Sequence, residues 1–259
     1  MSLISLVENS FFDNGRYWGA LNASLYNSGS IWSMKTGIES ADLNWVWNEK
    51  PLEASDRKAI QYIKKDFFQS RLPFWWWIYP GTASALTLEM LRAEGFSFVT
   101  EVPSLLSDLK RLSDEEANAG AVSLVQVQTR KELHWWEDIS FSGFDFSPET
   151  REPYHQFVQS FDLSPAAAQK FFLASVDGKP VATSLVFFNG HAAGFYFVTT
   201  LSEYRKRGIG LALTRKMMQF AKKAGLSFAS LQSSPEGFHM YQQAGFKEIC
   251  RIAVYSLGA

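Results

Sequence analysis

One segment of the chain reads in order as an apolar strand, a basic turn and the start of a helix: Phe195-Tyr-Phe-Val-Thr-Thr-Leu-Ser-Glu-Tyr-Arg-Lys-Arg-Gly-Ile-Gly-Leu-Ala-Leu213. The turn contains three cations and two glycines, which are Arg205, Lys206, Arg207, Gly208 and Gly210. Glycine lets a backbone approach a ligand closely, and the first amides of a helix have no partner within the helix. The segment therefore predicts a cradle for a phosphate group.

Two common phosphate-binding motifs do not fit this turn. The nucleoside-triphosphate loop has Lys-Ser or Lys-Thr after its second glycine, where this chain has Leu211-Ala212. The dinucleotide fingerprint has three glycines in one turn, and this turn has two. The pattern that fits is Arg or Gln, two residues, Gly, one residue, and Gly or Ala. It is the pattern of the coenzyme A pyrophosphate loop in the GNAT N-acetyltransferase superfamily, which Arg205-Lys-Arg-Gly208-Ile-Gly210 resembles.

A second segment strengthens this resemblance. It reads as a strand end, a serine-rich cap and a short helix that ends at a glycine: Leu231-Gln-Ser-Ser-Pro-Glu-Gly-Phe-His-Met-Tyr-Gln-Gln-Ala-Gly-Phe246. GNAT enzymes carry a Tyr four residues before a Gly-Phe pair here, and Tyr241 with Gly245-Phe246 matches. The frequent Asn seven residues before that Tyr is Ser234 in this chain. The resemblance implies the α+β fold, with α/β/α layers, of the acyl-CoA N-acyltransferases.

Composition narrows the class of protein. The length of 259 residues allows one large domain or two small ones. A net charge of -1 gives no electrostatic footprint for nucleic acid, and no apolar run is long enough to span a membrane. The single cysteine, Cys250, reads as a core residue and cannot form an internal disulfide. We expect a soluble cytoplasmic protein without a membrane or nucleic-acid partner, and a homodimer stays open.

The elements expected after residue 121 follow the GNAT order. Two helices follow the first strand, one from Thr129 to about Ile139 and one from about Pro148 to Ser160. The expected strands are 122–127, 171–176, 181–188, 192–199 and 228–232. A helix to about Ala224 follows the glycine turn, a short helix surrounds Met240, and a final hairpin is expected over 246–256.

The first half of the chain contains an echo of the second. The segment 91–105 aligns with 241–255, each as a helix end, a Gly-Phe junction and a strand. Strands are expected near 31–35, 44–47 and 74–78, with a helix over 54–70. A polar stretch at 112–121 separates the halves. We therefore predict a degenerate GNAT-like domain at 1–112 and an acetyl-CoA-binding GNAT domain at 121–259.

The first copy lacks the residues that would bind a coenzyme. Asn48-Glu-Lys-Pro-Leu-Glu53 precedes its helix without a glycine pair, and Leu91 stands where the second copy has Tyr241. The sequence therefore predicts a single coenzyme site, and it leaves open whether the first half binds another ligand.

The resemblance also implies a role for each site residue. The main chain of the strand binds the pantetheine arm and points one amide at the thioester oxygen, the turn amides bind the pyrophosphate, and Tyr241 donates a proton to the departing thiolate. The coenzyme-binding residues are Val198, Thr199, Thr200, Arg205, Lys206, Arg207, Gly208, Ile209, Gly210, Leu211 and Ser234. Three alternatives stay open: Arg205 holds the turn, Ser234 caps the next helix, and Tyr241 packs in the core.

The acceptor side is less defined. Candidate bases by residue type are Glu203, Glu137, Asp138, Asp145, His134 and His155, whereas His239 reads as a surface residue. The aromatic residues expected to form the acceptor wall or the seam between the halves are Trp135, Trp136, Phe141, Phe144, Phe146, Phe195 and Tyr196. No His/Cys/Asp cluster shows metal-ligand spacing, so no metal is expected.

These patterns predict an N-acetyltransferase that moves an acetyl group from acetyl-CoA to an amine of a small molecule, amino acid or peptide. Two alternatives remain. One is a transferase of the same fold that extends a peptide from aminoacyl-tRNA, against which the lack of a basic surface argues. The other is a non-catalytic module that senses acyl-CoA.

Overall fold

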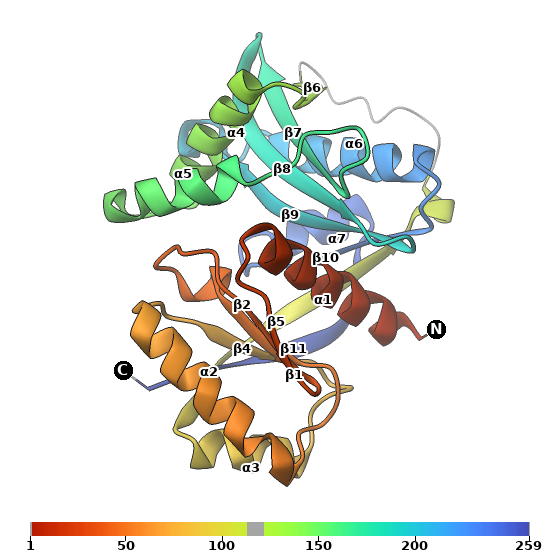
Figure 1. Ribbon diagram of the computed structural model, residues 1–259. Coiled ribbons are helices and arrows are strands. Elements are labelled where there is room, and N and C mark those ends of the chain that lie inside the picture. The colour runs from red at the N-terminus through yellow and green to blue at the C-terminus, as the bar shows by residue number, and fades with distance from the viewer. Residues whose placement is uncertain (1, 113–121, 259) are drawn as a thin grey trace. The chain divides into compact units, whose positions relative to one another are not determined.

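The computed structural model describes residues 2–112 and 122–258, so the predicted boundary at 112–121 lies, except for Leu112, outside the described residues. The chain divides into two compact units. Unit 1 comprises Met1–Ser104, Glu152–Ser160 and Ile249–Ala259, and unit 2 comprises Leu105–Arg151 and Phe161–Glu248. Figure 1 labels the elements along the chain.

Unit 2 contains a mixed sheet. Its strands are β6 (Val122–Gln126), β7 (Gln169–Val176), β8 (Lys179–Phe188), β9 (Ala192–Thr200), β10 (Phe228–Gln232) and the end of β5 (Phe96–Asp108). The strand order is β5-β10-β9-β8-β7-β6. The pairs from β6 to β9 are antiparallel, whereas β10 runs parallel to β9. The helices are α4 (Arg130–Gly143), α6 (Ile209–Lys223), which connects β9 to β10, and α7 (Phe238–Ala244).

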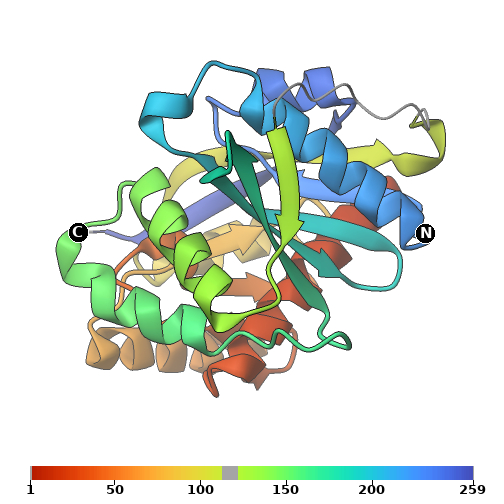
Figure 2. The same cartoon turned by 90° about the horizontal axis from the view of Figure 1, so that it is seen from above.

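Two adjacent residues of β7 show that this sheet has a helix on each face. Neighbouring side chains of a strand point to opposite faces. The ring of Phe171 contacts Trp136 of α4 at 5.3 Å between centroids, and the ring of Phe172 contacts Phe220 of α6 at 4.8 Å. Figure 2 shows α4 and α6 on opposite sides of these strands. The predicted α+β fold with α/β/α layers is thus confirmed.

Unit 1 has its own sheet and helices. Its strand order is β1-β2-β3-β4-β11-β5. Besides β5, the strands are β1 (Tyr26–Ser28), β2 (Ile31–Met34), β3 (Trp45–Asn48), β4 (Trp75–Ile78) and β11 (Lys247–Leu257). The helices are α1 (Leu3–Leu21), α2 (Arg57–Ser70), α3 (Ala85–Ala93) and α5 (Arg151–Gln159). The sequence patterns do not predict α1, whose Phe11 ring stacks on Trp45 at 4.3 Å.

The internal echo has a structural counterpart. In unit 1, α2 connects the parallel strands β3 and β4, as α6 connects β9 and β10 in unit 2. After each of these strand pairs a helix ends at a glycine with positive φ, 90° at Gly95 and 105° at Gly245, and a long strand follows. The left-handed conformation explains why both junctions carry glycine.

The hairpin predicted over 246–256 is wrong. This segment forms one strand, β11, because Lys247–Leu257 contains no Gly, Pro, Asn or Asp that would favour a turn. The strand pairs with β4 of unit 1, with Val254 opposite Trp77. Cys250 is half-buried in β11 and not a core residue.

The predicted domains 1–112 and 121–259 each consisted of one continuous segment. The compact units instead group Glu152–Ser160 and Ile249–Ala259 with the first part of the chain. Two domains with the predicted limits therefore stay a proposal. Among the described residues, no helix combines the length and apolar character that crossing a membrane requires.

Candidate functional site

The end of β9 is irregular. Thr183 of β8 is opposite Thr199, and Leu185 is opposite Tyr196, so Ser184 alone faces two residues of β9. These two residues, 197 and 198, form a β-bulge, and Phe197 has φ 50°. A bulge bends the strand and disrupts its pairing, and such features are common next to active sites.

Beyond this point β9 and β10 are no longer paired. Their parallel pairing runs from Ala192 opposite Phe228 to Gly194 opposite Ser230. Both strands continue past the last pair, β9 to Thr200 and β10 to Gln232. The backbone of Val198, Thr199 and Thr200, predicted to hold the pantetheine arm, therefore lies beyond the paired region.

The side chain of Thr199 is buried and packs against α4. Its Oγ1 donates a hydrogen bond to the carbonyl of Gly143 at 3.0 Å. A Cβ at Gly143 would lie 2.5 Å from that Oγ1, so only glycine fits there. Sequence reasoning missed Gly143, because nothing in its neighbourhood distinguishes it from an ordinary helix end.

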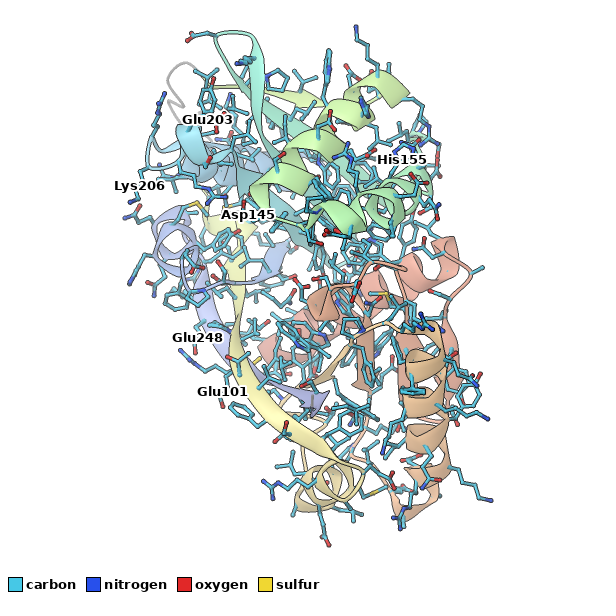
Figure 3. The ribbon with its side chains drawn as sticks, turned by 90° about the vertical axis from the view of Figure 1, so that its left-hand side faces the viewer. Glu101, Asp145, His155, Glu203, Lys206 and Glu248 are labelled. Atoms are coloured by element: carbon cyan, nitrogen blue, oxygen red, sulfur yellow. The ribbon has the colours of Figure 1, made fainter. Side chains whose placement is uncertain are left out.

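The turn before α6 adopts the backbone predicted for a cradle. Lys206 has φ 60° and Gly208 has φ 76°. Gly208 is the N-cap of α6 and, among the described residues, no side chain caps this helix. The amides of Ile209, Gly210 and Leu211 therefore belong to an open helix start, where the helix dipole favours an anion. Lys206 and Arg207 are exposed at the same turn (Figure 3 labels Lys206).

Arg205 braces this turn. Its Nε donates to the carbonyl of Thr200 at 2.9 Å, and its Nη2 donates to the carbonyl of Gly143 at 2.8 Å. These bonds tie the end of β9 to the end of α4. They agree with the alternative in which Arg205 holds the turn.

The residues around the helix start are closely packed. Ile209 is buried and anchors the first turn of α6 in the apolar core, and Leu211 is half-buried. A Cβ at Gly210 would lie 2.9 Å from Sδ of Met240, which belongs to α7. The absence of a side chain at Gly210 thus lets α7 approach α6, in addition to exposing the backbone.

Tyr241 lies on α7 and is 8% exposed. Its ring packs edge to face on Phe246 at 5.9 Å and belongs to the apolar core of unit 2. Burial raises the pKa of Tyr241 above its ordinary value near 10, so the phenol stays protonated at neutral pH. Tyr241 thus meets the requirements of both interpretations, because its ring is buried as in a core residue and its hydroxyl is protonated as in a proton donor.

The raised pKa predicts a pH-dependent stability. A phenol whose pKa is higher in the folded state stabilises the fold below its unfolded pKa, and this contribution is lost as the pH rises beyond about 10. We expect wild type to lose more unfolding free energy than Tyr241→Phe between pH 8 and pH 10.5, as measured by urea unfolding. Equal losses in both proteins would contradict the shift.

Ser234 is exposed and precedes α7. Its Oγ accepts a hydrogen bond from the amide of Gly237 at 3.2 Å. Gly237 is also close to the tyrosine, because a Cβ there would lie 2.9 Å from Cε2 of Tyr241. Ser234 therefore orders the turn that leads to α7, whose N-cap is Gly237 and which no side chain caps among the described residues, so the capping alternative is not met in its strict sense.

The candidate bases differ in their exposure to solvent. Asp145 and Glu203 are exposed (Figure 3), whereas the Glu137 side chain is fully buried and forms an ion pair with Nη2 of Arg151 at 3.2 Å. Arg151 also pairs with Asp138. His239 is exposed, as predicted, and contacts Gln242 at 3.3 Å.

The expectation that no cluster has metal-ligand spacing needs correction. His134, Glu137 and Asp138 share one face of α4 at i, i+3 and i+4, and their ligand atoms lie within 4.8 Å of one another. Arg151 already forms ion pairs with both carboxylates and supplies the positive charge there.

Two of the predicted acceptor-wall residues are core residues. Trp136 is fully buried and its Nε1 donates to the carbonyl of Ser184 at 3.0 Å, and Phe195 is 2% exposed. Trp135 and Phe144 are each 42% exposed. Phe144 contacts the ring of Phe197 in the bulge at 5.8 Å. The remaining rings, Phe141, Phe146 and Tyr196, are half-buried.

In unit 1, side chains cap the segment that corresponds to the uncapped start of α6 in unit 2. The counterpart of α6 is α2, and a 3₁₀ turn at Ala54–Asp56 leads directly into it. In this turn Glu53 and Asp56 form a capping box, and Asp56 accepts from the amide of Glu53 at 2.9 Å. At the end of β3, Asn48 bonds Trp76 and the carbonyls of Lys50 and Thr82. Carboxylates at this helix start repel an anion, in agreement with the predicted lack of a second coenzyme site.

We therefore predict one coenzyme A molecule per chain. Isothermal titration with acetyl-CoA should give a stoichiometry of about one, because within residues 2–112 and 122–258 we find one helix start, that of α6, with uncapped amides beside a bulge of β9. A stoichiometry near two would show that unit 1 also binds the coenzyme despite Glu53 and Asp56.

Known structures share this fold. A GCN5-related N-acetyltransferase from Kribbella flavida superposes with a TM-score of 0.72 at 18% identity, over 96% of this chain and 95% of that one. One from Sphaerobacter thermophilus gives 0.64 at 15% identity, over 89% and 78%. A tandem GNAT protein from the clavulanic acid biosynthesis pathway gives 0.57 at 12% identity, over 88% and 83%. At these identities the comparisons show the fold alone.

The sequence itself matches a family model. Residues 107–238, just over half of the chain, match the model described as "Acetyltransferase (GNAT) domain". The matched region contains the bulged strand, the basic glycine turn and Ser234. The predicted resemblance is thus confirmed, and the chain belongs to the GNAT acetyltransferase family.

Proposed function

We propose that this chain transfers an acetyl group from acetyl-CoA to an amine of a small molecule, an amino acid or a peptide terminus. The observation that carries the proposal is the uncapped start of α6, which follows the bulged end of β9, where β9 no longer pairs with β10. An open helix start suits a pyrophosphate, and exposed strand backbone suits the amide groups of a pantetheine arm. Family membership supports acyl transfer, and the donor and acceptor are our inference.

In this proposal each residue of the coenzyme site has a separate role. The amides from Lys206 to Leu211 bind the pyrophosphate, and Lys206 and Arg207 add positive charge. The main chain of Val198 to Thr200 binds the pantetheine arm. Arg205 keeps the turn attached to Thr200 and Gly143, and Ser234 orders the adjoining turn at the coenzyme.

The chemistry requires that the departing thiolate gains a proton and that the amine loses one. The amine nitrogen attacks the thioester carbon, an N–C bond forms, and the C–S bond breaks. The departing thiolate takes the hydroxyl proton of Tyr241, which burial keeps protonated, and Tyr241 regains a proton from solvent. The amine loses its extra proton to a base or to water. The proposal involves no metal, and a cytoplasmic location is part of it.

A single assay separates the candidate functions. Thiol release from acetyl-CoA is measured with a panel of amines that includes amino acids, peptides and aminosugars, and thermal stabilisation by acetyl-CoA is measured in parallel. Stabilisation together with amine-dependent thiol release supports the proposal. Stabilisation without thiol release on any amine favours the acyl-CoA sensor. If neither stabilisation nor thiol release is seen, acetyl-CoA binding is contradicted, and the aminoacyl-tRNA-dependent alternative becomes the next candidate to test.

A further inference from the structure

Phe197 has an unusual backbone for its residue type. It lies inside β9 with φ 50°, a left-handed conformation that bulky residues rarely adopt. Such a strained conformation persists only where the surrounding structure determines it. The groups around Phe197 are therefore expected to hold the bulge in place.

Three side chains hold this bulge. Thr183 of β8 is fully buried, and its Oγ1 donates a hydrogen bond to the carbonyl of Phe197 at 3.0 Å. The rings of Trp136 and Phe144 contact the Phe197 ring at 5.4 and 5.8 Å. Trp136 also binds the carbonyl of Ser184, the residue opposite the bulge.

The bond from Thr183 orients the next amide. The carbonyl of Phe197 and the N–H of Val198 belong to one peptide unit, which is trans and planar, so they point in opposite directions. Because that carbonyl points to the Thr183 hydroxyl on β8, the Val198 N–H points away from that hydroxyl. In the strand order β8 and β10 lie on opposite sides of β9, and Val198 lies beyond the last β9–β10 pair.

We propose that Thr183 is a positioning residue, whose hydroxyl fixes the Phe197–Val198 peptide so that the Val198 amide hydrogen-bonds the acyl carbonyl oxygen of the bound thioester. The inference rests on the proposed function. Thr183 acts only through the peptide and does not touch the coenzyme. A donor fixed before the reaction stabilises the charge that develops on this oxygen without reorganisation.

The test uses the bound thioester itself as a probe. Acetyl-CoA labelled with ¹³C at the acetyl carbonyl is bound to wild type, Thr183→Val, Thr183→Ala and Thr183→Ser, and its carbonyl stretch is recorded by isotope-edited infrared spectroscopy. Thr82→Val is the matched control, because the buried Thr82 hydroxyl also donates to a backbone carbonyl, that of Tyr79 in unit 1.

We expect the carbonyl stretch to move to lower frequency in wild type, Thr183→Ser and Thr82→Val, and to move back towards the free value in Thr183→Val and Thr183→Ala. With an active amine, kcat should fall about tenfold or more in the two hydroxyl-free variants, while the acetyl-CoA dissociation constant changes less than about threefold. A full frequency shift in Thr183→Val, or an equal loss in Thr183→Ser, would overturn the inference. If wild type does not bind acetyl-CoA, the proposed function fails, and this inference fails with it.

Discussion

Gly208→Val should reduce the affinity of the chain for acetyl-CoA by about 100-fold or more. Gly208 has φ 76°, which a β-branched residue cannot adopt without strain. A change of this backbone would turn the first amides of α6 away from the pyrophosphate. Losing two charge-assisted hydrogen bonds of about 1.5–3 kcal/mol each corresponds to at least about 100-fold in affinity. Isothermal titration with acetyl-CoA measures the effect directly.

The chain offers a closely matched control for this substitution. Gly178, in the turn between β7 and β8, also has φ 76°, and a Cβ at either glycine would meet nothing within 4 Å. Gly178→Val therefore introduces the same local strain in unit 2 without changing the turn before α6. We expect it to lower stability while it leaves acetyl-CoA affinity within about threefold of wild type. Unchanged affinity in Gly208→Val would remove the turn from the binding site.

Local sequence signals predicted much of the site. The turn before α6 was recognisable because glycines at positive φ and clustered cations are both visible in the sequence. The capped start of α4 was equally visible, since Thr129 and Glu132 form the expected capping box. These features depend on residues that lie close together in the chain.

Other features depend on distant residues and could not be predicted in this way. The bulge at Phe197 arises from Thr183, Trp136 and Phe144, which come from three separate segments. Nothing in the residues around Phe197 marks the positive φ. The strand β11 is not predictable from its own residues because its neighbours in the sheet, β4 and β5, lie more than 130 residues earlier in the chain.

The two units share one order of elements but differ in whether the start of the connecting helix leaves its backbone amides free for a ligand. Each contains a helix that connects two parallel strands. In unit 2 a glycine begins this helix and leaves its amides available, whereas in unit 1 Glu53 and Asp56 form a capping box in the 3₁₀ turn that leads into α2. The difference is in the charge and the capping of one helix turn, and not in the order of elements.

Tyr241→Phe should lower kcat by about 10²- to 10⁴-fold, the range that a single proton donor contributes. The substitution removes the hydroxyl and retains the ring that packs on Phe246, so the fold and the affinity for acetyl-CoA should stay close to those of wild type. Single-turnover thiol release, measured with an acceptor found in the amine panel, reports the chemical step itself.

Tyr255→Phe is a suitable control because Tyr255 is also buried and makes an edge-to-face ring contact, with Phe98 of unit 1 at 5.9 Å. Its turnover should stay within about threefold of wild type, since Tyr255 is not among the residues assigned to the acyl-transfer site. If Tyr241→Phe retains full turnover, water or the acceptor protonates the thiolate, and Tyr241 is a core residue alone. If its turnover falls and the loss is largest with acetyl donors whose thiol leaving group is most basic, the role of proton donor to the leaving group is supported, because a more basic thiolate depends more on protonation as it departs.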